Sequence, residues 1–142
     1  MFSRLAAGEI NDVVARVGAR ADALFRSGKM NCAEAVLAAV RERFSPETPD
    51  HVVRLASGFG GGSASGCLCG AVSGGTIAFG LVLSGDRKAV AKLTTDLHTW
   101  FKAEYRTTCC RSITANGKSG CQALTANVAA KVAELLMGHA PL

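Results

Sequence analysis

Six cysteines are the residues of this 142-residue chain best able to do chemistry. They are Cys32, Cys67, Cys69, Cys109, Cys110 and Cys121. Cysteine thiolates bind metals, hold iron–sulfur clusters and exchange disulfides. In an oxidising compartment such cysteines form structural disulfides, whereas in a reducing one they more often bind metals or do redox chemistry. The first residues lack an apolar signal-peptide core, since Glu9 and Asp12 come too early. We therefore expect a cytoplasmic protein that uses its cysteines for metal or redox chemistry.

Four of the cysteines lie at or near expected helix starts. These are Cys32 after Asn31, Cys69 before a glycine-rich helix, Cys110 before a helical turn, and Cys121 after Ser119 and Gly120. Unpaired N–H groups and the positive end of the helix dipole favour a thiolate there, so we expect lowered thiol pKa values. Cys32 shares a helical stripe with Val36 and Val40, which points its sulfur inward. We expect convergence on one sulfur site, although free cysteines also serve as ordinary small core residues.

The elements that must position these cysteines are helices. Apolar residues recur at helical spacing over residues 10–26, 32–44, 86–106 and 121–137, and a short helix is expected over 50–56. Asn31 and Glu34 form a capping-box pattern, and Gly28 is placed to end the preceding helix. No alternating strand pattern competes. We predict an all-α, single-domain bundle (residues 1–142) of about five helices.

Residues 57–66 predict a glycine-rich loop, and the stretch after it predicts a buried central helix. Glycines at 70, 74, 75 and 80 cost this helix about 1 kcal/mol each relative to alanine. That cost is justified if another helix or a prosthetic group approaches the backbone closely. We expect Gly60, Gly61 and Gly70 to supply backbone around the cysteine centre. The same small-residue stretch, 66–85, also leaves room for a homodimer packed across it.

Charge and composition exclude several function classes. The net charge of +5 comes from 16 scattered basic residues against 11 acidic ones, and one Trp with one Tyr cannot build a base-stacking platform, so we expect no nucleic-acid binding. Residues 67–83 are too short for the roughly 18–20 residues of a membrane span. The glycine-rich loop lacks the Gly-Lys-Ser/Thr ending of a phosphate-binding loop.

Cysteine spacing alone identifies no metal. The chain has a Cys-x-Cys at 67–69 and a vicinal pair at 109–110 but no Cys-x-x-Cys. That absence argues against thioredoxin-type sites and zinc ribbons, and the ferredoxin cysteine runs are missing too.

Three segments together resemble a known group. They are Asn31–Val36, then Ala56–Gly62 leading into Cys69–Gly74, then Cys110–Arg111 with Cys121. The chain resembles, over residues 24–137, the small redox-active proteins named for a C_GCAxxG_C_C signature. The resemblance implies that Cys32, Cys69, Cys110 and Cys121 are the four signature cysteines. Cys67 and Cys109 are then extra, with Cys109 an alternative to Cys110. It also implies a redox or electron-transfer role with an iron–sulfur or disulfide centre, and supplies no substrate.

Three hypotheses follow. The first, slightly ahead, is an electron carrier whose four cysteines ligate an iron–sulfur cluster and which works with an unidentified redox partner protein. The second is a thiol–disulfide protein that cycles pairs such as Cys32–Cys69 and Cys110–Cys121. The third is a zinc-binding or interaction module within a redox complex. Whether the chain is an enzyme is left open, because no substrate can be identified.

Overall fold

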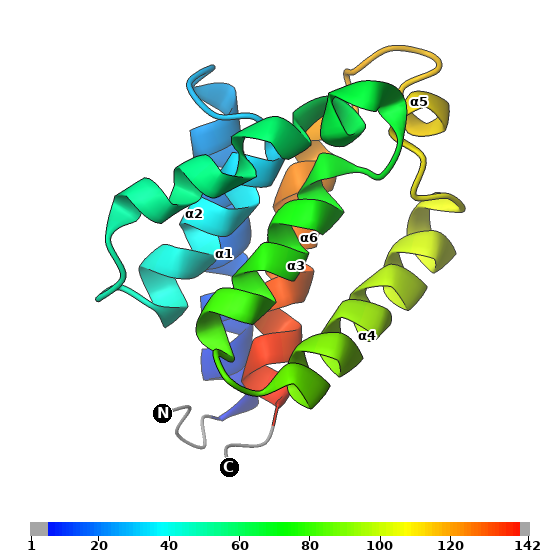
Figure 1. Cartoon of the computed structure of the whole chain (residues 1–142). Helices are drawn as coiled ribbons and strands as arrows, with labels where there is room; N and C mark the ends of the chain where they lie inside the picture. The colour runs from blue at the N-terminus through cyan, green and yellow to red at the C-terminus, as the bar shows by residue number, and fades with distance from the viewer. Residues whose placement is uncertain (1–5, 140–142) are drawn as a thin grey trace.

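The computed structural model describes residues 6–139, and these residues form one helical bundle without a named strand (Figure 1). The elements are α1 (Ala7–Arg26), α2 (Cys32–Phe44), the 3-10 helix η1 (Asp50–Phe59), the π-helical turn η2 (Gly62–Gly66), α3 (Gly70–Val82), α4 (Arg87–Tyr105), α5 (Cys110–Ile113) and α6 (Cys121–Gly138). This confirms the all-α fold. The expected count of about five helices is slightly low, because short helical turns also form before α3 and at α5.

Local capping chemistry sets where α2 begins. The Asn31 side chain accepts a hydrogen bond from the Glu34 N–H at 2.9 Å, and the Glu34 carboxylate accepts one from the Asn31 N–H at 3.0 Å. This reciprocal pair satisfies N–H groups that would otherwise lack partners at the helix start. The preceding helix ends at Arg26, and Gly28 turns the chain with φ 78°. The sequence prediction of both boundaries is confirmed.

Helix α3 lies at the centre of the bundle (Figure 1). It packs on α2, α4 and α6, while α1 lies along α6 and also contacts α2. Nine of its residues are buried, as the prediction of a buried central helix requires. The largest fully buried side chains of the common core come from α2, α3, α4 and α6 and are Leu37, Phe79, Leu97, Phe101 and Leu136, with valines at 36, 40, 72, 128 and 132.

The glycines of α3 allow neighbouring helices to pack closely against it, as we inferred from their cost to helix stability. A Cβ on Gly74 would meet the Ala33 carbonyl oxygen of α2 and lie 2.9 Å from the Ala33 Cα. A Cβ on Gly75 would lie 2.8 Å from a Val132 methyl of α6. Gly80 is the exception, with no atom within 4 Å of an added Cβ. Only part of the stripe is therefore needed for packing.

The glycine-rich segment 57–66 begins as the end of a 3-10 helix and continues as a closed left-handed turn, not as an open loop. Helix η1 extends through Phe59, and Gly61, Gly62, Ser63 and Ala64 then adopt positive φ values between 55° and 67°. This left-handed run curls the chain until the Cys67 N–H donates to the Gly62 carbonyl at 3.0 Å. The sequence predicted a loop that turns but not the closed form of this turn. The chain then runs through Cys67 and Cys69 into α3.

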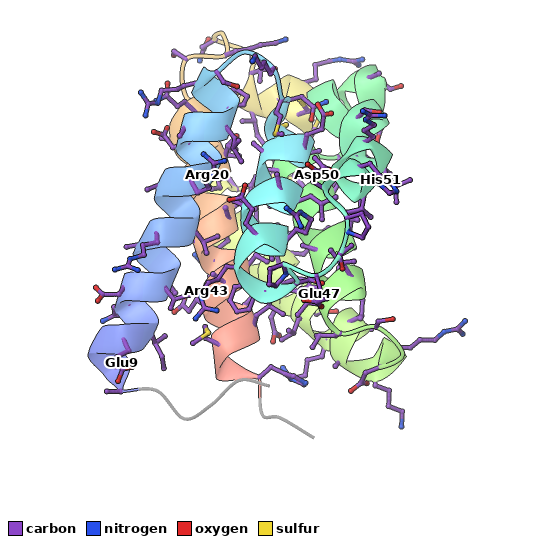
Figure 2. All side chains as sticks on the ribbon, turned by 90° about the vertical axis from the view of Figure 1, so that its left-hand side faces the viewer. Glu9, Arg20, Arg43, Glu47, Asp50 and His51 are labelled. Carbon is purple, nitrogen blue, oxygen red and sulfur yellow. The ribbon has the colours of Figure 1, made fainter. Side chains whose placement is uncertain are left out.

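Polar contacts on the surface join the outer helices. Arg20 of α1 forms a bidentate ion pair with Glu42 of α2, at 2.9 and 3.1 Å, on the side of the bundle shown in Figure 2. Both side chains are exposed, so solvent screening limits the pair to about 0–1 kcal/mol. The fold therefore depends on its apolar core, and such pairs add little.

Candidate functional site

Four cysteines from four helix starts line one pocket of about 180 Å³. Cys32 is the first residue of α2, Cys110 of α5 and Cys121 of α6, while Cys69 is the N-cap of α3. These helix starts lie at the end of the bundle away from the chain termini (Figure 1). The structure therefore brings together all four cysteines that the sequence singled out.

A short backbone pairing brings Cys69 and Cys110 to the same place from distant parts of the chain. Leu68 and Cys109 form an isolated antiparallel bridge. Beside it, the Cys69 N–H donates to the Thr108 carbonyl at 2.7 Å, and the Cys110 N–H donates to the Cys67 carbonyl at 2.6 Å. These bonds hold the start of α3 against the start of α5.

Burial raises the pKa of three of the pocket thiols, contrary to the expectation of lowered values. Cys69 is 6% exposed, and burial raises the pKa of its thiol to about 12. Burial also raises the pKa of Cys32 and of Cys121. The free-energy cost of removing a thiolate from water exceeds the stabilisation that the helix-start N–H groups provide. Neighbouring cysteines also disfavour a second negative charge. The neutral thiol is therefore favoured at Cys32, Cys69 and Cys121.

The helix-start N–H groups do act on these sulfurs, although they do not dominate. Backbone N–H groups of Gly61 and Ala33 lower the pKa of Cys32 against the larger effect of burial. Those of Val72 and Ala71 do the same at Cys69. The predicted interaction is thus present, but desolvation has a larger and opposite effect on the thiol pKa. Desolvation depends on tertiary packing.

Cys110 rather than Cys109 faces the pocket. Cys110 is a pocket-lining residue, and its charge would raise the pKa of Cys32, Cys69 and Cys121, whereas Cys109 has neither property. The Cys109 sulfur instead lies 3.5 Å from the Gly66 carbonyl oxygen. Hydrogen bonds from Ser112, first from its side chain and then from its N–H, lower the pKa of Cys109, with Arg111 adding to the effect. The vicinal pair is therefore split between pocket and surface.

The three glycines expected near the centre differ in their surroundings. Gly61 and Gly70 line the pocket. A Cβ on Gly70 would lie 2.6 Å from both the Cys32 sulfur and the Phe59 carbonyl oxygen, so only glycine fits there. Gly60 is not a lining residue and packs against Asn31, where a Cβ would come within 2.5 Å of the side-chain nitrogen. Its contact with the centre is through the cap of α2.

Seven further residues line the pocket that were not predicted as site residues. They are mostly apolar or small, with one charged member, and comprise Phe25, Asn31, Ile113, Thr114, Lys118, Leu124 and Thr125. Lys118 lowers the pKa of Cys121, although burial and Cys110 act in the opposite direction. Nothing in the sequence marks Lys118, because it precedes Cys121 in an irregular segment. It places a positive charge beside a site that becomes negative when thiolates form.

Within residues 6–139, no three His, Cys, Asp or Glu side chains are grouped so as to hold one metal ion. A single zinc ion needs its sulfur ligands about 2.3 Å from one point. In a four-iron cluster each iron takes its own thiolate, so the sulfurs stand farther apart around a shared body. Cys32, Cys69, Cys110 and Cys121 line one pocket without being gathered around a single point.

Comparison with known proteins gives one match. The family model described as "Putative redox-active protein (C_GCAxxG_C_C)" matches residues 30–135, about three quarters of the chain. This range includes all six cysteines. No curated protein and no solved structure matches significantly. In addition, no helix among the described residues is long and apolar enough to cross a membrane.

Proposed function

Because the chain belongs to the C_GCAxxG_C_C family of redox-active proteins, we propose that its four pocket cysteines hold an iron–sulfur cluster that transfers electrons. The observation that supports this most is the convergence of Cys32, Cys69, Cys110 and Cys121 on one pocket. Each comes from a different helix start, so the four thiols surround a shared body from several directions. When bound, such a cluster supplies one-electron transfer.

The chain's own groups are suited to tune such a centre. Backbone N–H groups of Gly61, Ala33, Ala71 and Val72 interact with the Cys32 and Cys69 sulfurs. Hydrogen bonds to ligand sulfurs and exclusion of water are two of the factors that set a cluster's potential. Gly70 allows the Cys32 sulfur to approach the start of α3, because any larger residue would collide with it. These residues orient and shield the sulfurs.

Loading the pocket requires its thiols to give up protons. Ligands must be deprotonated to bind metal, and the pKa of Cys32, Cys69 and Cys121 is raised. Lys118 lies where it can offset part of the resulting negative charge. We therefore expect proton release on loading, and weaker loading as the pH falls.

The test is anaerobic reconstitution of the reduced protein with iron and sulfide, followed by metal and sulfide analysis and a visible spectrum. We expect cluster absorption with near-stoichiometric iron and sulfide. Cys32→Ala, Cys69→Ala, Cys110→Ala and Cys121→Ala should each lose most of the bound iron. Cys67→Ala and Cys109→Ala are matched controls outside the pocket lining and should retain it. A colourless, metal-free wild-type protein would exclude the proposal.

A second candidate, thiol–disulfide cycling in the pocket, is favoured by the nearness of its thiols. The charge of Cys32 would raise the pKa of Cys69, and the charge of Cys110 would raise that of Cys121. Cys121 and Cys110 would likewise raise the pKa of Cys32, and Cys110 that of Cys69, so all four thiols are near one another and the pairing Cys32–Cys69 with Cys110–Cys121 is part of the proposal. This candidate predicts reversible loss of four thiols without bound metal. Its weakness is that raised thiol pKa values leave little thiolate at neutral pH to attack a disulfide.

A further inference from the structure

The exposed cysteine, Cys67, has no part in the function proposed above. It is the only one of the six cysteines that is fully on the surface, while Cys110, which lines the pocket, is partly buried. Forty-two positions separate them in the sequence. The backbone pairing at Leu68 and Cys109 brings these two residues together, and this raises the question of what they could do as a pair.

The hydrogen-bond pattern determines the register of that pairing. The Cys110 N–H donates to the Cys67 carbonyl at 2.6 Å, and the Cys69 N–H donates to the Thr108 carbonyl at 2.7 Å. Around the antiparallel Leu68–Cys109 bridge, this places Cys67 directly opposite Cys110. Directly opposite residues of an antiparallel pairing have Cα atoms about 4.5–5.5 Å apart. The 2.6 Å backbone hydrogen bond keeps Cys110 beside Cys67, although Cys110 begins α5 and Cys67 is not extended (φ −88°, ψ −109°). Disulfides span Cα separations of about 4.4–6.8 Å, so the register suits a bond between these residues.

Gly62 gives independent evidence for the closeness of the two cysteines. A Cβ built on Gly62 would lie 2.6 Å from the Cys110 Cβ and 2.7 Å from the Cys67 backbone nitrogen. The same backbone position is therefore in contact with both cysteines. In addition, the Arg111 guanidinium donates to the Ser65 carbonyl at 3.1 Å and packs beside Gly66. This contact fastens the segment before Cys67 to α5.

Cys109 is less well placed to pair with Cys67. It lies opposite Leu68, one position out of register with Cys67. Its sulfur contacts the Gly66 carbonyl oxygen rather than the pocket. Cys67 is therefore the surface cysteine in register with Cys110. Its thiol donates to the Ser65 carbonyl oxygen at 3.8 Å, a contact that a disulfide with Cys110 would replace.

We propose that Cys67 and Cys110 form a reversible cross-strand disulfide that withdraws one sulfur from the four-cysteine pocket. The oxidant is a small-molecule disulfide, RSSR. The exposed Cys67 thiolate attacks RSSR, forming Cys67–S–S–R and releasing one RSH. Cys110 then attacks the Cys67 sulfur, forming the internal disulfide and releasing a second RSH. Two thiols are oxidised, RSSR is reduced to two RSH, and the two protons leave with those products.

The consequence for the pocket rests on the function proposed above. Cys110 cannot ligate a metal centre while it is bonded to Cys67. A pocket with three available cysteines would hold a cluster poorly, so oxidation of an exposed residue would control loading of a half-buried site. The disulfide itself does not depend on the cluster, and the two ideas can fail separately.

The test begins with reduced, metal-free wild-type protein incubated with oxidised glutathione. Proteolysis without reductant and fragmentation mass spectrometry then identify which cysteines are joined. We expect a Cys67–Cys110 link that dithiothreitol reverses, that persists in Cys109→Ser, and that is lost in Cys67→Ser and Cys110→Ser. Cys67 and Cys109 both lie outside the pocket lining, so these two variants should fold normally. A dominant link to Cys69, Cys109 or Cys121, or only glutathione adducts, would overturn the proposal.

The second part of the test separates the disulfide from the function of the pocket. The oxidised protein is desalted and offered iron and sulfide without added thiol, beside the reduced protein and oxidised Cys67→Ser. Because sulfide can itself open a disulfide, mass spectrometry of the same sample checks that the Cys67–Cys110 link persists during loading. Lower iron uptake by the oxidised wild type alone would support control of loading by the disulfide. Equal uptake by all three would reject that control. If none takes up iron while the Cys67–Cys110 link forms, the cluster proposal fails and the disulfide proposal stands.

Discussion

Replacing Gly74 with alanine tests whether close packing of α3 on α2 maintains the pocket. The new Cβ would meet the Ala33 carbonyl oxygen and lie 2.9 and 3.0 Å from the Ala33 Cα and carbonyl carbon. These are backbone atoms, so no side-chain rotation can relieve the overlap and α2 must move. Overpacking of this kind costs about 1–3 kcal/mol. Alanine also stabilises a helix by about 1 kcal/mol relative to glycine, and this gain must be subtracted from the measured change in stability.

The variant Gly80→Ala, in the same helix, serves as the control that removes this propensity gain from the comparison. Gly80 is exposed and has no atom within 4 Å of an added Cβ, so this variant gains propensity without overlap. Subtracting the two effects leaves the packing cost, and Gly74→Ala should be less stable than Gly80→Ala by about 1–3 kcal/mol. Urea unfolding of the reduced proteins measures this difference if the m-values agree. Equal stabilities would refute the close-packing argument.

The same substitution should affect the site. Ala33 directly follows Cys32, whose sulfur lies against Gly70, so a displaced α2 carries Cys32 away from the start of α3. We expect native-state alkylation of Cys32 to be faster in Gly74→Ala than in Gly80→Ala or the wild type. Unchanged Cys32 reactivity beside a clear loss of stability would show that the pocket tolerates the shift.

Three further predictions concern the helix start and the thiols. Asn31→Ala removes the cap of α2 and the hydrogen bond from its side chain to Ser57, and should cost about 1 kcal/mol in urea unfolding, whereas Asn31→Ser should lose less. The pKa of Cys69 is raised from 9.0 to about 12, so as pH rises between these values the unfolded chain loses its proton first and reduced-protein stability should fall. Cys69→Ala should flatten this decline, by up to about 1.4 kcal/mol per pH unit, and an unchanged slope would contradict the assignment. Cys109, with its lowered pKa, should be alkylated by iodoacetamide at lower pH than Cys121, whose pKa is raised, and peptide mapping along a pH series decides the order.

The helices were predictable because their signals are local. The cap at Asn31, the turn at Gly28 and the apolar stripes each depend on residues a few positions apart. The closed turn after Phe59 was not predictable in this way, because its left-handed residues include Ser63 and Ala64, which do not favour that conformation. Its shape depends on contacts of Gly62 with Cys110, far along the chain.

The convergence of the four cysteines was predictable from the sequence, whereas their electrostatics and the other pocket-lining residues were not. Helix-start positions correctly grouped Cys32, Cys69, Cys110 and Cys121 around one pocket. The sign of the pKa shift was wrong for three of them, because the helix start is a local feature whereas burial is set by the assembled core. The division of the vicinal pair, with Cys110 inside and Cys109 outside, likewise needed the pairing with Cys67–Cys69.

This electrostatic result links the chemistry of the pocket to its proton balance. Thiols with raised pKa can pack in a largely apolar pocket as neutral groups, whereas several thiolates there would repel one another. Lys118 is the one cation among the described residues that line the pocket. Any use of the site must therefore replace the lost protons. A metal cluster replaces them with positive charge on iron, and a disulfide replaces them with a covalent bond between sulfurs. Counting the protons released on iron loading, and on oxidation without iron, would show which replacement the protein makes, because only loading that releases protons in step with bound iron agrees with a cluster.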